Sequence, residues 1–197
     1  MGARAVTIRG LVSISIALIA GCAAPPATRD LPSRIEFAKL RPGTATIPVI
    51  DKRTDELRAS RAVQGFGTLY RFGDDSLEPR PVALVSARVA ETLPPRFRAM
   101  PIELTRLDIG LWSNASFPEA TVARTGSVTV ITVPGWGSEE AAVQIELNVA
   151  GNPVTAVERV RIRPGAPLEP ALEKAFTAAL ASIGEKIDAM KYWTPTP

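Results

Sequence analysis

Histidine is absent from this 197-residue sequence, and cysteine occurs only once, at position 22. Without histidine, the chain lacks the commonest general base at neutral pH and the commonest metal ligand in proteins. A single cysteine cannot form an intramolecular disulfide, and it cannot complete a Cys/His zinc site or a catalytic triad. The glycine-rich phosphate-binding motifs are absent as well, and no acidic pair stands out for carboxylate catalysis. We therefore expect a protein that is not an enzyme and that binds neither a metal nor a cofactor.

The first 21 residues have the pattern of an export signal. Arg4 and Arg9 form a basic leader, and the uncharged run from Gly10 to Ala20 is too short to span a bilayer, which needs about 20 apolar residues. The run ends in LIAGC, where small residues come directly before Cys22, and this resembles the lipobox of bacterial lipoproteins. The resemblance implies that Cys22 is acylated and becomes the first mature residue. The alternative is an ordinary secretory signal in which Cys22 is merely a small apolar residue.

A proline-rich segment follows, from Ala23 to Arg34 (AAPPATRDLPSR). It lacks apolar periodicity, so we expect an extended and largely unpacked tether over 22–34, followed by one folded domain over 35–197. In the sorting rule of Gram-negative lipoproteins, aspartate directly after the acylated cysteine favours the inner membrane. Here that residue is Ala23, which predicts an outer-membrane anchor with the domain facing the periplasm.

The basic character of the chain lies mostly in its leader. Two of the 23 Lys and Arg residues and none of the 20 Asp and Glu residues precede Cys22, so the remaining side chains sum to +1. A phosphate-binding surface needs many unneutralised cations, so we do not expect nucleic acid as a partner.

The first half of the domain predicts two strands and a helix. The strands are expected at Thr44 to Asp51 and at Val63 to Phe72, with a turn at GDDS directly afterwards. Pro79 to Leu93 predicts a helix with apolar residues at steps of three and four, and Pro94-Pro95 ends it.

The second half predicts four strands and a long helix. Over Pro101 to Trp112 the apolar residues change parity, which predicts a bulge near Thr105-Arg106 that keeps them on one face. SVTVITVP, from Ser127 to Pro134, is β-branched on both faces and suits a central strand. The alternation after residue 142 predicts a hairpin that reverses at Gly151-Asn152, with Val149 opposite Val154 and Gln144 opposite Arg159. The seven apolar positions of the final helix are Leu168, Leu172, Phe176, Leu180, Ile183, Ile187 and Met190.

Together these elements predict an α+β fold. It is a two-layer sandwich with a mostly antiparallel sheet and two helices packed on one face. The series IPVIDKR, GFGTLYRFGDD and PRPVALVSARVAETL, behind a lipobox, resembles the YajG-type uncharacterised lipoproteins of proteobacteria. In that family a strand ending in Asp-x-Arg precedes a glycine-containing strand and a helix. The resemblance covers about residues 44–93 and implies a location and a fold, but no catalytic residue.

Three groups of residues are candidates for an interaction surface. Arg159, Arg161 and Arg163 form a basic stripe on the wet face of the hairpin, which could bind anionic lipid or polysaccharide or be a solvated surface. Asp51 and Arg53 at a strand end could pair or hold a neighbouring loop, as an exposed ion pair worth under about 1 kcal/mol. Trp136, between two glycines, could serve recognition or packing.

The sequence therefore predicts a non-catalytic interaction or assembly module, anchored to the outer membrane and partnered by an envelope protein. The alternative is a lipid- or lipopolysaccharide-binding accessory component of an envelope transport system. An apolar cavity opening beside Arg159 and Arg161 would favour the alternative.

Overall fold

The computed structural model describes residues 27–44, 47–62, 68–113, 120–124, 127–132 and 139–192. For residues 27–30, 62, 68–69, 113, 120–124 and 127–132, only the course of the backbone is described. The predictions for the leader, for Cys22 and for Trp136 lie outside these residues.

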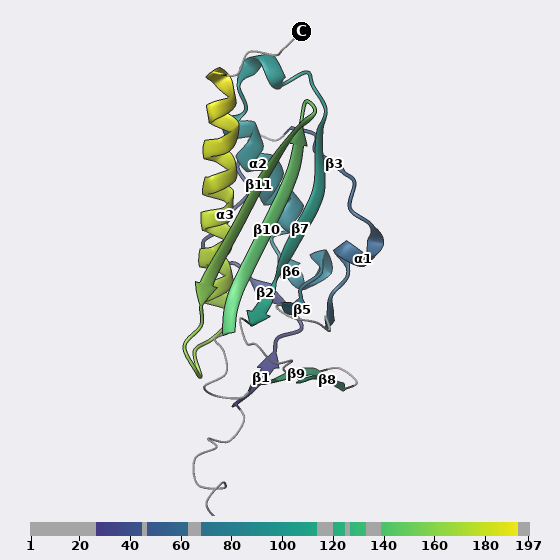
Figure 1. The fold of residues 1–197 in the computed structure, drawn as a ribbon, viewed down its shortest axis with the longest axis vertical. Helices are drawn as coiled ribbons and strands as arrows, with labels where there is room; N and C mark the ends of the chain where they lie inside the picture. Colours follow the sequence, from purple (N-terminus) through teal and green to yellow (C-terminus); the bar gives the residue numbers. More distant parts are fainter. Residues whose placement is uncertain are drawn as a thin grey trace, which may run out of the picture.

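Three long antiparallel strands form the centre of the molecule (Figure 1). They are β7 (Ile102–Ser113), β10 (Glu139–Val149) and β11 (Asn152–Arg161). The order of the sheet is β11-β10-β7-β5-β4, and β3 also pairs with β7. Each central strand alternates apolar and polar residues, so one face of the sheet carries the core and the other faces solvent.

The predicted bulge in β7 is confirmed. Leu107 lies opposite Ile145 and Leu104 lies opposite Leu147, so Thr105 is the extra residue. This one residue restores the alternation, because Ile102, Leu104, Leu107, Ile109 and Leu111 are all buried.

Two short strands share the other edge of β7. β3 (Ile50–Asp51) runs parallel to β7 beside Glu103 and Leu104. β5 (Thr68–Arg71) runs antiparallel to β7 near its far end and pairs in turn with β4 (Arg61–Ala62). β3 is shorter than the sequence predicts, because residues 47–49 are described and are not part of it, whereas residues 63–67 of the second predicted strand lie outside the described residues. The four-residue helix α1 (Asp55–Arg58) between β3 and β5 was not predicted.

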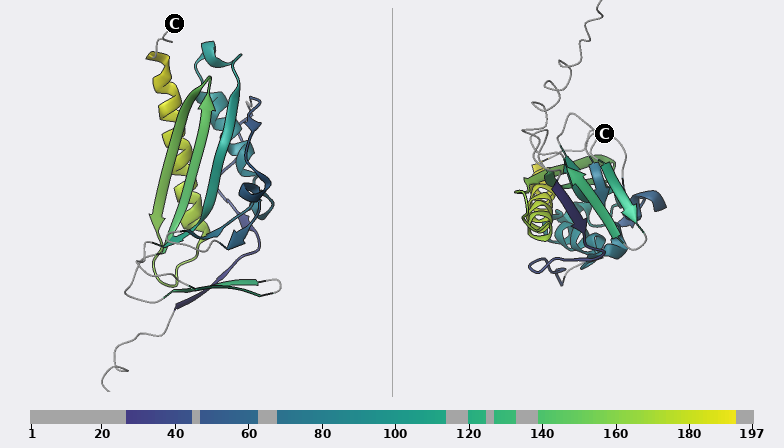
Figure 2. Two further views of the ribbon diagram at one scale, coloured as in Figure 1. Left: turned by 45° about the vertical axis from the view of Figure 1, so that its right-hand side comes forward. Right: turned by 90° about the horizontal axis from the view of Figure 1, so that it is seen from below.

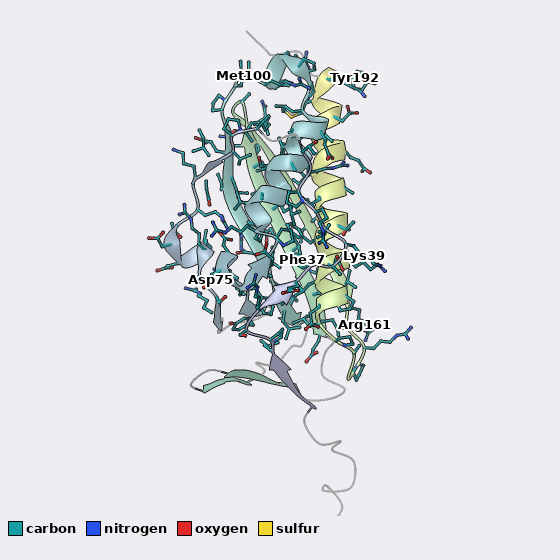
Figure 3. All side chains as sticks on the ribbon, turned by 180° about the vertical axis from the view of Figure 1, so that it is seen from behind. Phe37, Lys39, Asp75, Met100, Arg161 and Tyr192 are labelled. Atoms are coloured by element: carbon teal, nitrogen blue, oxygen red, sulfur yellow. The ribbon has the colours of Figure 1, made fainter. Side chains whose placement is uncertain are left out.

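Two helices cover the apolar face of the sheet. These are α2 (Pro81–Thr92) and α3 (Glu169–Ala189), and both lie in front of the sheet when the molecule is seen from behind (Figure 3). A short 3-10 turn, η1 (Asp74–Ser76), lies within the expected turn sequence GDDS, and two more follow the helices: η2 (Pro95–Phe97) after α2 and η3 (Met190–Tyr192) after α3. All the predicted apolar positions of α3 are buried except Met190, which is partly buried.

The hairpin of β10 and β11 is tighter than predicted. Val149 pairs with Asn152, so Ala150 and Gly151 alone form the turn, and both have positive φ, 53° and 87°. This is the arrangement of a two-residue type I′ turn. The predicted register was therefore wrong by two residues, and Arg159 lies opposite Ala142 instead of Gln144.

A separate three-stranded sheet lies at the end of the molecule where the described chain begins (Figure 2). Its order is β1 (Ala27–Leu31), β9 (Ser127–Thr132) and β8 (Ala120–Arg124). β9 is thus a middle strand, as predicted, but not of the main sheet. The segment expected to be unpacked contributes β1, and Leu31 at its end is buried. The prediction of an unpacked tether rested on the proline-rich composition of this segment, and composition does not show that a distant strand, β9, pairs with its backbone.

The chain between β1 and β3 joins the core along α3. β2 (Ile35–Glu36) pairs in parallel with β6 (Leu77–Glu78), and Phe37 packs against Phe176 of α3 with ring centroids 5.6 Å apart. The predicted α+β class, with both helices on one face of a mostly antiparallel sheet, is confirmed. In the part of the chain that the structure describes, no helix has the length and apolarity to cross a membrane.

Candidate functional site

Asp51 and Arg53 are brought together with a third residue, Asp74, at the end of β3. The Arg53 guanidinium donates two hydrogen bonds to Asp51, from Nε to Oδ1 at 3.0 Å and from Nη2 to Oδ2 at 2.8 Å. It donates two more to Asp74, from Nη1 to Oδ1 at 3.0 Å and from Nη2 to Oδ2 at 2.6 Å. The expected pairing of Asp51 with Arg53 is confirmed, and Arg53 also holds the neighbouring turn through Asp74. The Arg53 side chain is only 1% exposed, so this pair is buried and is not the exposed ion pair that was expected.

Electrostatics favours the charged form of this cluster. Burial alone would raise the pKa of Asp51, but the hydrogen bonds and positive charge of Arg53 outweigh it and hold that pKa below its ordinary value. The two carboxylates in turn raise the pKa of Arg53 further above its usual range, against the effect of burial. A carboxylate held ionised in this way does not act as a general acid near neutral pH. The cluster joins β3 to the turn at Asp74, and we assign it a structural role.

A second ionic network lies on the solvent face of the sheet. Arg71 Nε of β5 lies 2.9 Å from Asp108 Oδ1 of β7, at an angle that does not suit a hydrogen bond. The other oxygen of Asp108 accepts a hydrogen bond from Arg106 Nε at 2.6 Å, and Arg106 also lies 3.7 Å from Glu146 of β10. Sequence reasoning missed Asp74, Arg71, Asp108 and Arg106. The ion pairs Arg53–Asp74, Arg71–Asp108 and Arg106–Glu146 each join distant parts of the chain, although Arg106 and Asp108 are only two residues apart.

Glycine at position 110 allows β5 to approach β7 beside this network. A Cβ at Gly110 would lie 2.1 Å from the carbonyl oxygen of Tyr70. Next to Gly110 on β10 is Ala142, another small residue. The two leave a shallow hollow of about 40 Å³ on the solvent face, bordered by Arg71, Asp108, Trp112, Val157 and Arg159.

Arg159 lies at the rim of this hollow, on the face that the sequence predicted. Its guanidinium carbon is 4.3 Å from the centre of the Trp112 ring, the geometry of a cation–π contact. Trp112 is half-buried on the solvent face of the sheet, beneath this arginine. Val157, with 47% of its surface exposed, lies beside Arg159 on the same face of β11.

Arg161 and Arg163 continue from Arg159 along β11 and past its end, and all three residues are exposed. Glu140 lies opposite Arg161 in the register, but no ion pair joins them. In the described part of the chain, none of the three arginines has a carboxylate partner. They are the nearest feature to a binding surface that the sequence identified.

Two wider depressions lie away from the arginines, and both are open to solvent. One, of about 550 Å³, lies between the hairpin turn and the end of α3, bordered by Pro153 and Lys186. The other, of about 640 Å³, lies between residues 47–49 and the first turns of α2. Among the described residues, no three His, Cys, Asp or Glu side chains are grouped so that they could hold a metal ion.

Asp51 and Asp74 are acidic residues whose carboxylates converge on one point. The guanidinium of Arg53 fills the space between them, so they do not form the open carboxylate pair that glycoside hydrolysis needs.

Comparison with known proteins identified no relative of this chain. No family model, no curated protein and no solved structure matches the chain.

Proposed function

We propose that this chain is an outer-membrane lipoprotein, held by acyl chains on Cys22, whose domain is a non-catalytic interaction module facing the periplasm. The anchor rests on the basic leader, the short apolar run and the LIAGC sequence. The YajG-type resemblance is part of the same proposal.

One observation carries the interaction role: the solvent face of the main sheet is left uncovered by the helices and carries an arginine stacked on a tryptophan. Aromatic residues and arginine are enriched in protein interfaces and in their energetic hot spots. Arg159 on Trp112, the exposed Val157 and the unpaired Arg161 form such a combination along the outer part of this face.

An acyl anchor would strengthen this role by concentrating the domain near membrane-bound partners. Multiple acyl chains bind a bilayer far more firmly than a single chain does. A partner in the same membrane would then meet the domain at a raised effective concentration, so a modest intrinsic affinity is sufficient.

Site-specific crosslinking in the native envelope tests the proposal. A photoreactive amino acid is placed at Gln144, in the middle of the solvent face on β10, and in a second variant at Glu185, on the exposed side of α3. We expect a discrete protein adduct from position 144 and none from position 185. Equal labelling from both positions, or none from either, would contradict the interaction role.

The anchor is tested separately by Cys22→Ser. We expect this variant to accumulate as an unlipidated precursor that does not incorporate palmitate, with Ser15→Ala in the same leader as the control that is processed normally. A Cys22→Ser protein that still incorporates palmitate would remove the basis for the localisation.

The alternative, a lipid- or lipopolysaccharide-binding accessory component, has less support. This alternative would be favoured by an apolar cavity beside Arg159 and Arg161, but the hollow beside Arg159 has a volume of only about 40 Å³. Pockets that enclose drug-sized ligands are about 300–1,000 Å³, so this hollow does not enclose an acyl chain.

A further inference from the structure

β11 is the outermost strand of the main sheet, and its backbone is paired on one side only. In an antiparallel hairpin, residues alternate between those whose backbone N–H and C=O point to the partner strand and those whose groups point away. Ile162 donates its N–H to Glu139 of β10 at 2.8 Å, which assigns the even-numbered residues to the β10 side. The N–H and C=O groups of Thr155, Val157, Arg159 and Arg161 therefore point to the free edge.

In the half of this edge nearest the hairpin turn, the outward backbone groups are not available to pair with another strand. Pro153 occupies an outward-facing position and has no N–H to offer. The next outward carbonyl, that of Thr155, accepts a hydrogen bond from the Lys186 ammonium group of α3. Proline and lysine are the residues by which natural edge strands prevent unwanted pairing.

In the other half of the edge, from Val157 to Arg161, no proline and no lysine contact of this kind is present among the described residues. In the described part of the chain, the outward groups of Val157, Arg159 and Arg161 have no hydrogen-bond partner, and their side chains are exposed on the solvent face. α3 packs along β11, whose apolar side chains Val154 and Ala156 are buried on the face opposite to the arginines. The free stretch therefore offers a short row of backbone donors and acceptors, the arrangement that binds an added strand.

The positive charge of this stretch indicates which kind of strand could pair with it. Arg159 and Arg161 alternate on the solvent face, Arg163 follows, and none of them is paired with a carboxylate in the described part of the chain. A second copy of β11 pairing with this edge in antiparallel fashion would place arginine opposite arginine, and like charges directly opposite are destabilising. Acidic side chains on an added strand would instead lie opposite arginines.

We propose that the edge from Val157 to Arg161 is a docking site for an acidic, extended segment of a partner protein, which adds to the main sheet as a strand beside β11. This rests on the proposed function as an interaction module and specifies its partner. Backbone hydrogen bonds hold the added strand, and the arginines select acidic residues at alternate positions.

Peptide binding to the purified full chain tests this docking. The probe is a fluorescently labelled nine-residue peptide of alternating threonine and glutamate with blocked ends, followed by anisotropy at low and at physiological salt. One control peptide has lysine for glutamate. A second has methylated backbone nitrogens at its glutamates, because residues directly opposite Arg159 and Arg161 are those whose N–H groups face β11. We expect binding by the first peptide only, weakened by salt, with slowed amide exchange at Val157, Arg159 and Arg161.

Two variants separate backbone pairing from charge. Val157→Pro removes one outward N–H and breaks no hydrogen bond within the protein, and β11 already accommodates a proline at the outward position 153. Loss of one backbone hydrogen bond to the peptide weakens binding by roughly fivefold to tenfold. Val157→Thr keeps the N–H and binds like the parent. Arg159→Gln with Arg161→Gln weakens binding by about tenfold and reduces its salt dependence.

Each other outcome overturns the docking proposal. Equal binding of the methylated peptide or by Val157→Pro would show an ionic contact without strand addition, and the methylated peptide settles this even if Val157→Pro does not fold. Binding only to vesicles of phosphatidylglycerol and phosphatidylcholine would make the arginines a lipid contact. If the peptide does not bind but position 144 still forms its adduct, the edge proposal fails and the interaction role stands; if neither occurs, both fail.

Discussion

The buried guanidinium of Arg53 gives the sharpest test of how this fold is held together. We consider Arg53→Met, which keeps an unbranched apolar stem and removes the charged group. The change deletes four charge-assisted hydrogen bonds of 2.6–3.0 Å and leaves Asp51 and Asp74 without their shared partner. Breaking a buried ion pair by removing one partner costs about 3–5 kcal/mol.

The two carboxylates decide where in that range the loss falls. Their side chains are 24% and 30% exposed, so water can solvate them again once the guanidinium is gone. We therefore expect Arg53→Met to lower the free energy of unfolding by about 3 kcal/mol, at the lower end of the range. At about 2–4 °C per kcal/mol for a domain of this size, the melting temperature falls by about 6–12 °C.

The loss has a defined dependence on pH. The pKa of Asp51 is lower in the folded protein than its ordinary value of 3.8, so its contribution to stability is present above pH 3.8 and is lost as the pH falls through the folded pKa. The difference between wild type and Arg53→Met is therefore largest near pH 7 and shrinks below pH 3.8.

Urea unfolding followed by circular dichroism at pH 7 and at pH 3 measures both effects. Arg61→Met is the matched control, because Arg61 is exposed and lies 3.6 Å from Glu56, which is also exposed, a pair worth under about 1 kcal/mol. If Arg53→Met were no less stable than Arg61→Met at pH 7, the structural role assigned to the cluster would be refuted.

Two further predictions concern glycine and turn geometry. Gly110→Ala places a methyl group against the Tyr70 carbonyl, so β5 must move away; we expect a loss of about 2–3 kcal/mol in urea unfolding, and almost none for Ala142→Ser on the neighbouring strand. Ala150→Asn puts a residue that tolerates positive φ into the hairpin turn, and we expect a gain of about 0.5 kcal/mol, measured as a higher melting temperature. Ala150→Val should lose stability instead, and a gain there would contradict the assigned turn.

The elements predicted best are those in which burial repeats along many residues. The change of parity at Thr105 predicted the bulge, because only one extra residue could return five apolar side chains to the core. The apolar positions of α3 predicted its buried face for the same reason. These patterns depend on one physical effect, the removal of apolar surface from water. The spacing of apolar residues along the sequence shows directly which face of an element is buried.

The elements predicted poorly depend on a single residue or on a distant partner. Ala150 conceals the hairpin turn, because alanine is not a residue that signals positive φ. Among the described residues of the expected first strand, only Ile50 and Asp51 pair with β7, and nothing in the sequence of that strand indicates where its parallel pairing begins. The candidate surface shows the same limit: the arginine stripe is visible in the sequence, whereas the cation–π contact with Trp112 depends on the register of three strands.

The divided edge of β7 has a consequence for the order in which the chain assembles. β7, β10, β11 and α3 pack mainly on one another, whereas β3 and β5 must each find a place on an edge that β7 provides. Pairings between distant parts of a chain form slowly, because a loop must close before any contact rewards it. β3 and β5 come before β7 in the chain, so these two strands are synthesised first and can pair with β7 only after β7 has itself been synthesised.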